Sequence, residues 1–295
     1  MTAGEKGFLL LSCCLGDPER KVLSSSQLRN LTKLAGLMNP PFEDRELTVD
    51  DLAAMGCSEL LAKRVHKLLS DEELLAWYLR DGRQSNCYPI TRISEDYPSA
   101  LYKVLGQEAP GSLWTMGNTQ LLKLPKISLV GSRDLHLQNR NFAAEAGRQA
   151  AKQGYVLVSG NARGADIVAQ NACLAAGGSV ISIVADALNS HREHERILYL
   201  SEDGFDLPFS SLRALRRNRL IHSLGAFVLV AQCRVGKGGT WSGTVNNLQK
   251  NLRPVFCFAD GSSAMVELVQ RGAGVIRTED LSDFGALRTD QMQFM

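Results

Sequence analysis

The sequence predicts an α/β fold, in which a mostly parallel sheet carries helices on both faces and a small helical domain precedes it. Three observations lead to this prediction. Short apolar runs alternate with helical patterns from residue 127 to residue 276. Two of these runs end in turns of small residues, at 131–133 and at 159–166. Residues 1–85, by contrast, carry helical patterns throughout.

The first strand–helix–strand unit is the centre of the predicted sheet. Residues 127–130 and 155–158 are apolar runs of strand length, and residues 139–153 between them have a helical pattern. Parallel strands that are buried on both faces need such a crossover. Both small-residue turns follow strands at their carboxyl ends, where open α/β sheets bind ligands. Both turns carry an arginine and glycine before a helix start, which favours an anion, so we expect a Rossmann-like core that binds phosphate. A nicotinamide cofactor fits poorly, because no Gly-x-Gly-x-x-Gly follows the first strand.

The remaining elements follow the same alternation. Further strands are predicted at residues 179–184, 226–231, 254–258 and 275–276. Helices are predicted at residues 164–176, 193–200, 217–224, 242–250 and 262–271. Residues 81–97 have the composition of a polar connector. We therefore expect a helical domain at 1–85, an α/β domain at 86–285 and a tail at 286–295.

The helical domain contains one pattern that is typical of DNA-binding proteins. An apolar run at 8–15 starts one helix, and serines at 24–26 offer caps for a second, which Asn39-Pro40-Pro41 would end. Met55-Gly56-Cys57 then separates two short helices, which is the outline of a helix-hairpin-helix. Ser58 stands where that motif usually has its second glycine. This segment either contacts DNA or serves as a packing module.

The composition is that of a soluble globular protein, with 44% hydrophobic and 22% charged residues among 295. No apolar run reaches the ~18–20 residues that a membrane span needs, and the run at 8–15 is too short for a signal peptide. Seven scattered cysteines without a C-x-x-C pair predict reduced thiols in a cytoplasmic protein, with no disulfide framework and no metal site. His191 and His194 are expected on a surface helix.

The charge is small overall but unevenly distributed. The chain has a net charge of +2, yet residues 120–255 hold 17 Lys and Arg against 9 Asp and Glu. The rest of the chain holds 16 against 22. The excess of positive charge on the α/β domain predicts a polyanionic partner there.

Several ordered motifs of the α/β domain resemble one known family. Residues 216–221 (Arg-Arg-Asn-Arg-Leu-Ile) precede the fourth predicted strand, the glycine-rich residues 236–244 follow it, and Arg253-Pro254 enters the fifth. With the turns at 131–133 and 159–166, this order resembles the DprA (Smf) family, the DNA-processing proteins of bacterial transformation, within the SLOG superfamily. The resemblance covers about residues 90–276.

The resemblance implies an extended Rossmann core that binds single-stranded DNA, forms a homodimer and helps to load a RecA-type recombinase. We therefore expect a non-enzymatic DNA-binding protein without a cofactor. Arginine offers a fork of donors to phosphate oxygens, and a basic groove binds single strands with little sequence preference. The implied DNA- or phosphate-binding residues, with those of the glycine-rich loop, are Gly131, Ser132, Arg133, Ser159, Gly160, Arg163, Gly164, Arg217, Asn218, Arg219, Lys237, Thr240, Gly243 and Thr244. We expect Arg217 and Arg219 to bracket the same groove as Arg133 and Arg163.

Two residues near these motifs have two interpretations each. Asp166 is the one acid inside a motif, and we expect it to cap a helix start and to pair with Arg163 or Arg133 rather than to act as a catalytic base. Trp241, in the glycine-rich loop, either stacks on a base or anchors the loop onto the sheet. Apolar stretches at 224–230 and 255–258 support the homodimer.

The departures from the family leave other functions open. Asn161, Ala165 and Gln170 differ from the residues usual at these positions, and the loop at 235–244 is longer and richer in glycine. The Gly-Gly-Thr stretch is similar to the phosphoribohydrolase branch of the superfamily, whose catalytic glutamate is absent here. The alternative functions are therefore a sensor or hydrolase of a nucleotide-derived ligand, or a degenerate core that serves as a scaffold.

Overall fold

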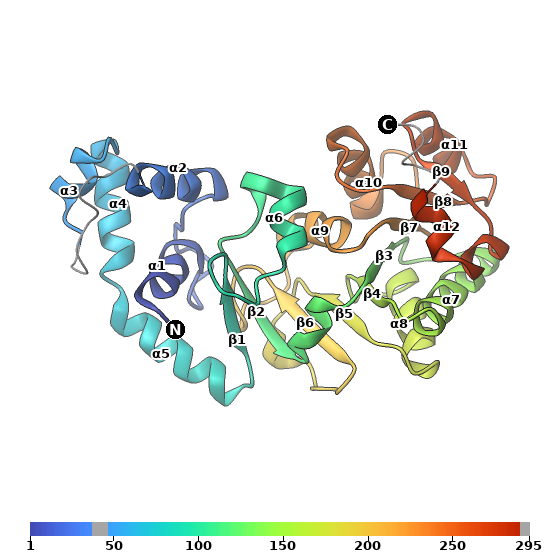
Figure 1. Cartoon of the computed structure of the whole chain (residues 1–295), viewed down its shortest axis with the longest axis horizontal. Helices are drawn as coiled ribbons and strands as arrows, with labels where there is room; N and C mark the ends of the chain where they lie inside the picture. Colours follow the sequence, from blue (N-terminus) through green and yellow to red (C-terminus); the bar gives the residue numbers. More distant parts are fainter. Residues whose placement is uncertain (37–46, 290–295) are drawn as a thin grey trace.

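The computed structural model describes residues 1–36 and 47–289 (Figure 1). The helix end predicted at Asn39-Pro40-Pro41 lies outside these residues. Within them, the strands form one sheet in the order β1-β2-β6-β5-β4-β3-β7-β8-β9. Pairing is parallel from β6 to β9 and antiparallel at β1 and β2. The predicted fold class, mostly parallel α/β with a helical N-terminal region, is confirmed.

The six strands that the apolar runs predicted are all present. They are β3 (Lys126–Val130), β4 (Val156–Ser159), β5 (Val180–Ile183), β7 (Val228–Val230), β8 (Val255–Phe258) and β9 (Gly274–Ile276). Side chains of β3 alternate between two cores: Ile127 and Leu129 pack on one face, and Val130 packs on the other. This alternation explains why the runs are apolar throughout, because a strand covered on both faces has no solvent side.

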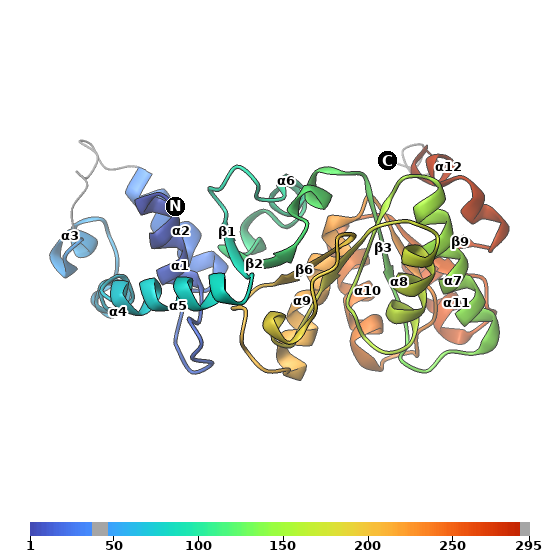
Figure 2. The same ribbon diagram turned by 90° about the horizontal axis from the view of Figure 1, so that it is seen from below.

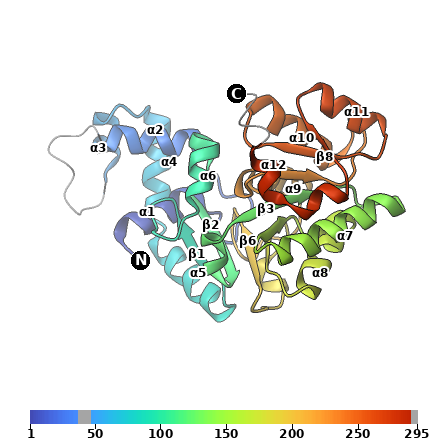
Figure 3. The same ribbon diagram turned by 45° about the vertical axis from the view of Figure 1, so that its right-hand side comes forward.

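Helices cover both faces of the sheet (Figure 3). One face is packed against α7 (Leu137–Lys152), α8 (Ala165–Ala175) and α12 (Phe284–Thr289), and the other against α6 (Ser99–Leu105), α9 (Ser211–Leu224), α10 (Gly238–Lys250) and α11 (Ser263–Gln270). Leu287 of α12 belongs to the core of the first face. The tail predicted from residue 286 therefore begins inside a packed helix.

The helix predicted at 193–200 is wrong. Residues Ile197–Ser201 form strand β6, which pairs in parallel with β5 and antiparallel with β2. The His191 ring lies in the preceding loop, where it stacks on Tyr199 with 4.6 Å between the ring centroids. The charged residues before β6 gave the segment a helical appearance, whereas the Leu198 and Leu200 side chains alternate with Tyr199 as in a strand.

The antiparallel edge of the sheet begins in the region that the sequence predicted as a polar connector, residues 81–97. Strand β1 (Tyr88–Thr91) pairs with β2 (Ser112–Gly117), and Trp114 of β2 is fully buried. Helices α1 (Ala3–Ser12), α2 (Ser25–Gly36), α3 (Val49–Ala54), α4 (Glu59–Leu69) and α5 (Glu72–Gln84) gather at this end of the molecule (Figure 2). The indole Nε1 of Trp114 donates to the Cys13 sulfur at 3.2 Å. The helical region and the sheet thus share a core at this edge.

The structure also bears on the predictions about the cysteines, membrane spans, Ser58 and the apolar stretches. All seven cysteines are free, and six of them are buried. Among the residues described, no helix is long and apolar enough to cross a membrane. Ser58 caps α4, because its Oγ accepts from the Leu61 amide at 3.4 Å. The apolar stretches at 224–230 and 255–258 are largely β7 and β8, whose apolar character reflects the core of this chain and gives no independent support for a dimer.

The contact between α7 and α8 predicts a contrast between two helical glycines. A Cβ on Gly147 would overlap the carbonyl oxygen of Ala169, whereas a Cβ on Gly7 in α1 meets nothing within 4 Å. Gly147→Ala should therefore destabilise the fold by about 2 kcal/mol or more, because backbone must move. Gly7→Ala should be neutral or stabilise by up to about 1 kcal/mol. Urea unfolding of both variants measures this contrast, and equal effects would contradict the described packing.

Candidate functional site

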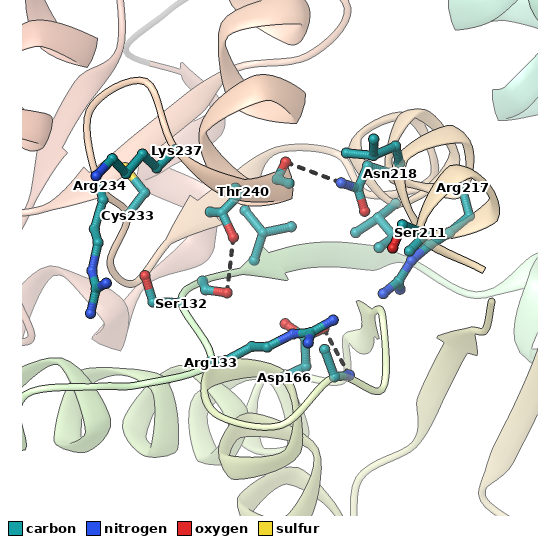
Figure 4. A pocket seen from close by; sticks show the side chains of 18 of the residues that line it. Ser132, Arg133, Asp166, Ser211, Arg217, Asn218, Cys233, Arg234, Lys237 and Thr240 are labelled. Carbon is teal, nitrogen blue, oxygen red and sulfur yellow. Dashed lines mark hydrogen bonds between the residues drawn. The ribbon is translucent and has the colours of Figure 1, made fainter. Parts of the chain in front are cut away.

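The order of strands creates a crevice between β3 and β7. From β3 the chain continues through α7 to β4, and from β7 it continues through α10 to β8 on the opposite face. Ligands of open α/β sheets bind where the direction of the strand order reverses in this way. A cavity of about 440 Å³ lies at the carboxyl ends of these strands (Figure 4).

About half of the residues predicted for the site line this cavity. They are Gly131, Ser132, Arg133, Asp166, Arg217, Asn218, Lys237 and Thr240. Residues that the sequence analysis did not single out complete the lining, among them Asp134, Phe209, Leu215, His222, Cys233 and Arg234. The cavity therefore has exposed cations on the turns, whereas α9 and Phe209 before it contribute apolar side chains together with Arg217, Asn218 and His222.

The two small-residue turns contact each other directly. The Ala165 amide of the second turn donates to the Ser132 carbonyl oxygen of the first turn at 3.2 Å. The first turn is also bonded to the segment after β7, because the Ser132 amide donates to the Gln232 carbonyl oxygen at 2.9 Å. Gly164 has a φ of +91°, and a Cβ there would overlap the carbonyl oxygens of Ser132 and Arg133. Glycine is required at this position both for its backbone conformation and for the close approach.

Asp166 stabilises the second turn by accepting hydrogen bonds from its backbone. It is buried, and its Oδ2 accepts from the amides of Gly160 at 3.0 Å and of Ala162 at 3.2 Å. Burial raises the pKa of the carboxyl group, and the charge of Arg217 and the two amides oppose that rise. The expected capping of the helix start is wrong, because both amides belong to the turn before α8 and no side chain caps that helix. Of the two expected partners, Arg163 instead forms an exposed salt bridge of 2.7 Å with Asp134. Arg133 forms no salt bridge with Asp166, but its charge favours the ionised carboxylate and acts to lower the pKa of Asp166.

The Arg217 side chain extends from α9 to the carboxyl end of β5 and lies over Gly160 of the second turn. It is buried, with 8% of the residue exposed, and Nη1 donates to the Ile183 carbonyl oxygen at 2.6 Å. A Cβ on Gly160 would overlap this guanidinium. Burial lowers the pKa of Arg217, and the nearby charge of Asp166 opposes the effect. In Figure 4, Arg133 and Arg217 point toward one another beside Asp166.

The glycine-rich loop closes the cavity from the other side. Thr240 Oγ1 donates to the Gly131 carbonyl oxygen at 2.9 Å, and Asn218 Nδ2 donates to the Gly239 carbonyl oxygen at 3.0 Å. Helix α10 starts here, and no side chain caps it. Helix α8 starts at the opposite turn, also without a side-chain cap. Such helix starts leave amide donors that favour an anion.

Three cations surround these helix starts. Arg133, Arg234 and Lys237 are exposed, and they form no salt bridge with any residue that the structure describes. Arg133 also adds unfavourable positive charge next to Arg217. Free cations beside two uncapped helices make this part of the cavity suited to bind phosphate groups.

Several predicted site residues lie outside the cavity and support it. Ser159 is fully buried, and its Oγ accepts from Gln170 Nε2 at 2.5 Å. Thr244 is fully buried in α10, and Gly243 lies against His222. Trp241 packs in the core, with the Arg271 guanidinium carbon 5.9 Å from its ring centroid. Of its two interpretations, anchoring of the loop agrees with this position and base stacking does not.

Arg219 is separated from Arg217, so the expected shared groove is wrong. Residues two apart on a helix point about 200° apart. Arg219 Nη1 donates to a carboxylate oxygen of Glu202 at 2.7 Å, and its Nη2 donates to the other. Arg216 and Arg219 line a second cavity of about 650 Å³ between α9 and the residues before α2. Arg216 and Arg219 are three residues apart and so share one face of α9.

His222 makes the stability of the site region dependent on pH. It is fully buried beside the cavity, its Nδ1 lies 3.1 Å from Asn247 Nδ2, and burial lowers its pKa to about 4. Because the unfolded pKa is about 6.5, stability is complete above pH 6.5 and is lost as the pH falls toward 4.

We predict that protonation of His222 lowers the free energy of unfolding by about 2 kcal/mol when the pH falls from 7 to 4.5. His222→Asn should remove that part of the pH dependence, whatever its effect at pH 7. Urea unfolding of both proteins at the two pH values measures the difference. An identical loss in both would show that His222 titrates in the fold as it does in water.

Comparisons with known proteins give one matching family model and several similar proteins. A family model described as DNA recombination-mediator protein A matches residues 89–284. The chain is 29% identical over 271 residues to the DNA processing protein DprA of Streptococcus pneumoniae, covering 86% of this chain and 92% of that protein. It is 30% identical over 180 residues to the protein Smf of Escherichia coli, covering 57% of this chain and 46% of that protein.

Two solved structures are similar in fold. The structure of DprA from Streptococcus pneumoniae gives a TM-score of 0.73 at 24% identity, and covers 95% of this chain and 98% of that one. The structure of DprA from Helicobacter pylori, which concerns the single-stranded DNA binding mode of that protein, gives a TM-score of 0.55 at 23% identity. It covers 70% of this chain and 96% of that one.

Proposed function

This chain belongs to the DNA recombination-mediator protein A family, and on that premise we propose that it binds single-stranded DNA at the cavity between β3 and β7. The relative from Helicobacter pylori is described with single-stranded DNA. The observation that carries the proposal for this chain is the set of exposed cations, Arg133, Arg234 and Lys237, beside the uncapped starts of α8 and α10. Phosphodiester groups are the anions of a nucleic acid that fit such a place.

The recessed position of the helix starts favours a single strand over a duplex. Ser132, Thr240 and the ends of α8 and α10 lie around a cavity at the sheet edge rather than on a flat face. A flexible single strand can bend its backbone into such a place, whereas a duplex holds its phosphates on a stiff cylinder. The protein then acts by binding, without a chemical step of its own.

The recombinase partner and the homodimer belong to the same proposal and follow from the family. The described surface assigns neither of them to particular residues. Light scattering at micromolar concentration would detect the dimer, and a monomer alone under those conditions would remove it from the proposal.

We predict that Arg133→Ala weakens binding of a labelled oligothymidylate about tenfold or more, because an unpaired charge-assisted contact is lost. The salt dependence should also become less steep by about 0.7 in the slope of log K against log salt, the value for one phosphate of a single strand. Lys237→Ala should behave in the same way. Fluorescence anisotropy at several salt concentrations measures both quantities.

Two other arginines serve as comparisons. Arg148 is paired with Glu145 on α7, away from the cavity lining, and Arg148→Ala should leave the affinity unchanged. Arg163→Ala should cost less than Arg133→Ala, because Asp134 already compensates its charge. Equal losses at all three arginines would mean a diffuse electrostatic surface. Salt-independent binding that free nucleotides abolish would favour the nucleotide-ligand alternative.

A further inference from the structure

A large aromatic side chain is exposed at the mouth of the cavity. Phe209 lines the cavity, yet 55% of the residue is exposed to solvent. Burying a phenylalanine side chain stabilises a protein by about 1.5–3 kcal/mol, so its position in solvent forgoes that stabilisation. Leu215, also in the lining, is 52% exposed. Leu212 precedes it by one helical turn and is exposed as well.

The loop that carries Phe209 is held firmly. Arg213 is nearly buried, and its Nη1 donates to the carbonyl oxygens of Ala185 at 2.9 Å, Leu207 at 2.7 Å and Pro208 at 2.9 Å. The same guanidinium pairs with Asp203 through Nε at 3.2 Å and donates to Ser201 through Nη2 at 2.9 Å.

The residue after Phe209 is fixed as well. Ser210 caps α9, because its Oγ accepts from the Arg213 amide at 3.1 Å. The residues on both sides of Phe209 therefore have defined positions, and the ring is presented on a preorganised backbone.

The exposed apolar side chains lie beside the unpaired cations. Phe209 and Leu215 line the same cavity as Arg133, Arg234 and Lys237. A partner that fits both parts must carry anionic groups and flat apolar groups at short spacing. Unpaired nucleotides present both, whereas a duplex buries the faces of its bases in the stack.

We propose that Phe209 is a stacking platform for an unpaired base, with Leu215 and Leu212 extending its apolar surface, and that it gives the site its preference for single strands. The inference rests on the proposed function, because the phosphates of the same strand would be held by the cations of the cavity. Phe209 binds the base, and Arg213 is a positioning residue for its loop.

The test compares three ligands of equal length: oligothymidylate, the same strand with abasic sites in place of bases, and a duplex. Phe209→Ala should weaken binding of oligothymidylate about tenfold, as expected for the loss of one base–aromatic stack. Its salt slope should stay unchanged, because no charge is removed. Binding of the abasic strand and of the duplex should not change. The melting temperature should be unaffected, since the side chain is exposed.

Two further variants complete the experiment. Phe209→Trp should keep the affinity, and its added fluorescence should be quenched by oligothymidylate but not by the abasic strand. Trp77→Ala is the matched control, because Trp77 is 52% exposed on α5 and should not affect DNA binding.

The outcomes separate the two proposals. Unchanged oligothymidylate affinity in Phe209→Ala overturns the stacking platform while the proposed function stands. Equal losses for oligothymidylate and the abasic strand also overturn it, because the ring would then act without a base. If the unaltered protein fails to bind oligothymidylate, the proposed function itself fails, and an apolar protein segment becomes the better occupant of this surface.

Discussion

The buried guanidinium of Arg217 is the interaction on which the shape of the cavity depends. It connects α9 to the carboxyl end of β5, lies over Gly160 in the turn after β4, and has Asp166 as its nearby negative charge. The two opposite charges compensate each other in part, because each opposes the effect of burial on the pKa of the other. Gly160 has no side chain because the guanidinium occupies that space. The ends of β4, β5 and α9 are thereby fixed around one cation.

Arginines that pair with carboxylates inside the fold do not add positive charge to the surface. The guanidinium of Arg213 pairs with Asp203, and that of Arg219 with Glu202. These arginines contribute to the charge of residues 120–255, yet they hold loops and helices in place. Arg133, Arg234 and Lys237, which form no salt bridge with any described residue, remain at the mouth of the cavity. A small group of unpaired cations beside two helix starts gives a defined binding place, whereas a broad basic face would not.

Sequence patterns predicted the elements of the sheet better than the direction of individual side chains. Buried parallel strands are apolar over their whole length, so their sequence pattern predicts them. The pattern did not predict β6, because the charged residues that precede it favoured a helix. The two glycine-containing turns, at 131–133 and 159–166, predicted the position of the cavity. Helical geometry then separated Arg219 from Arg217, and the long-range contact with Glu202 could not be inferred from spacing. Phe209 was not singled out, because exposure at a cavity mouth leaves no periodic pattern.

Binding of a single strand at the switch point between β3 and β7 is tested most directly by photocrosslinking. Oligonucleotides with 4-thiothymidine at successive positions would be crosslinked to the full chain, and the modified peptides identified by mass spectrometry. The predicted crosslinks fall within residues 131–134, 209–217 and 233–240, which surround the cavity. Crosslinks confined to helices α1–α5, with none at these three segments, would contradict binding at this site.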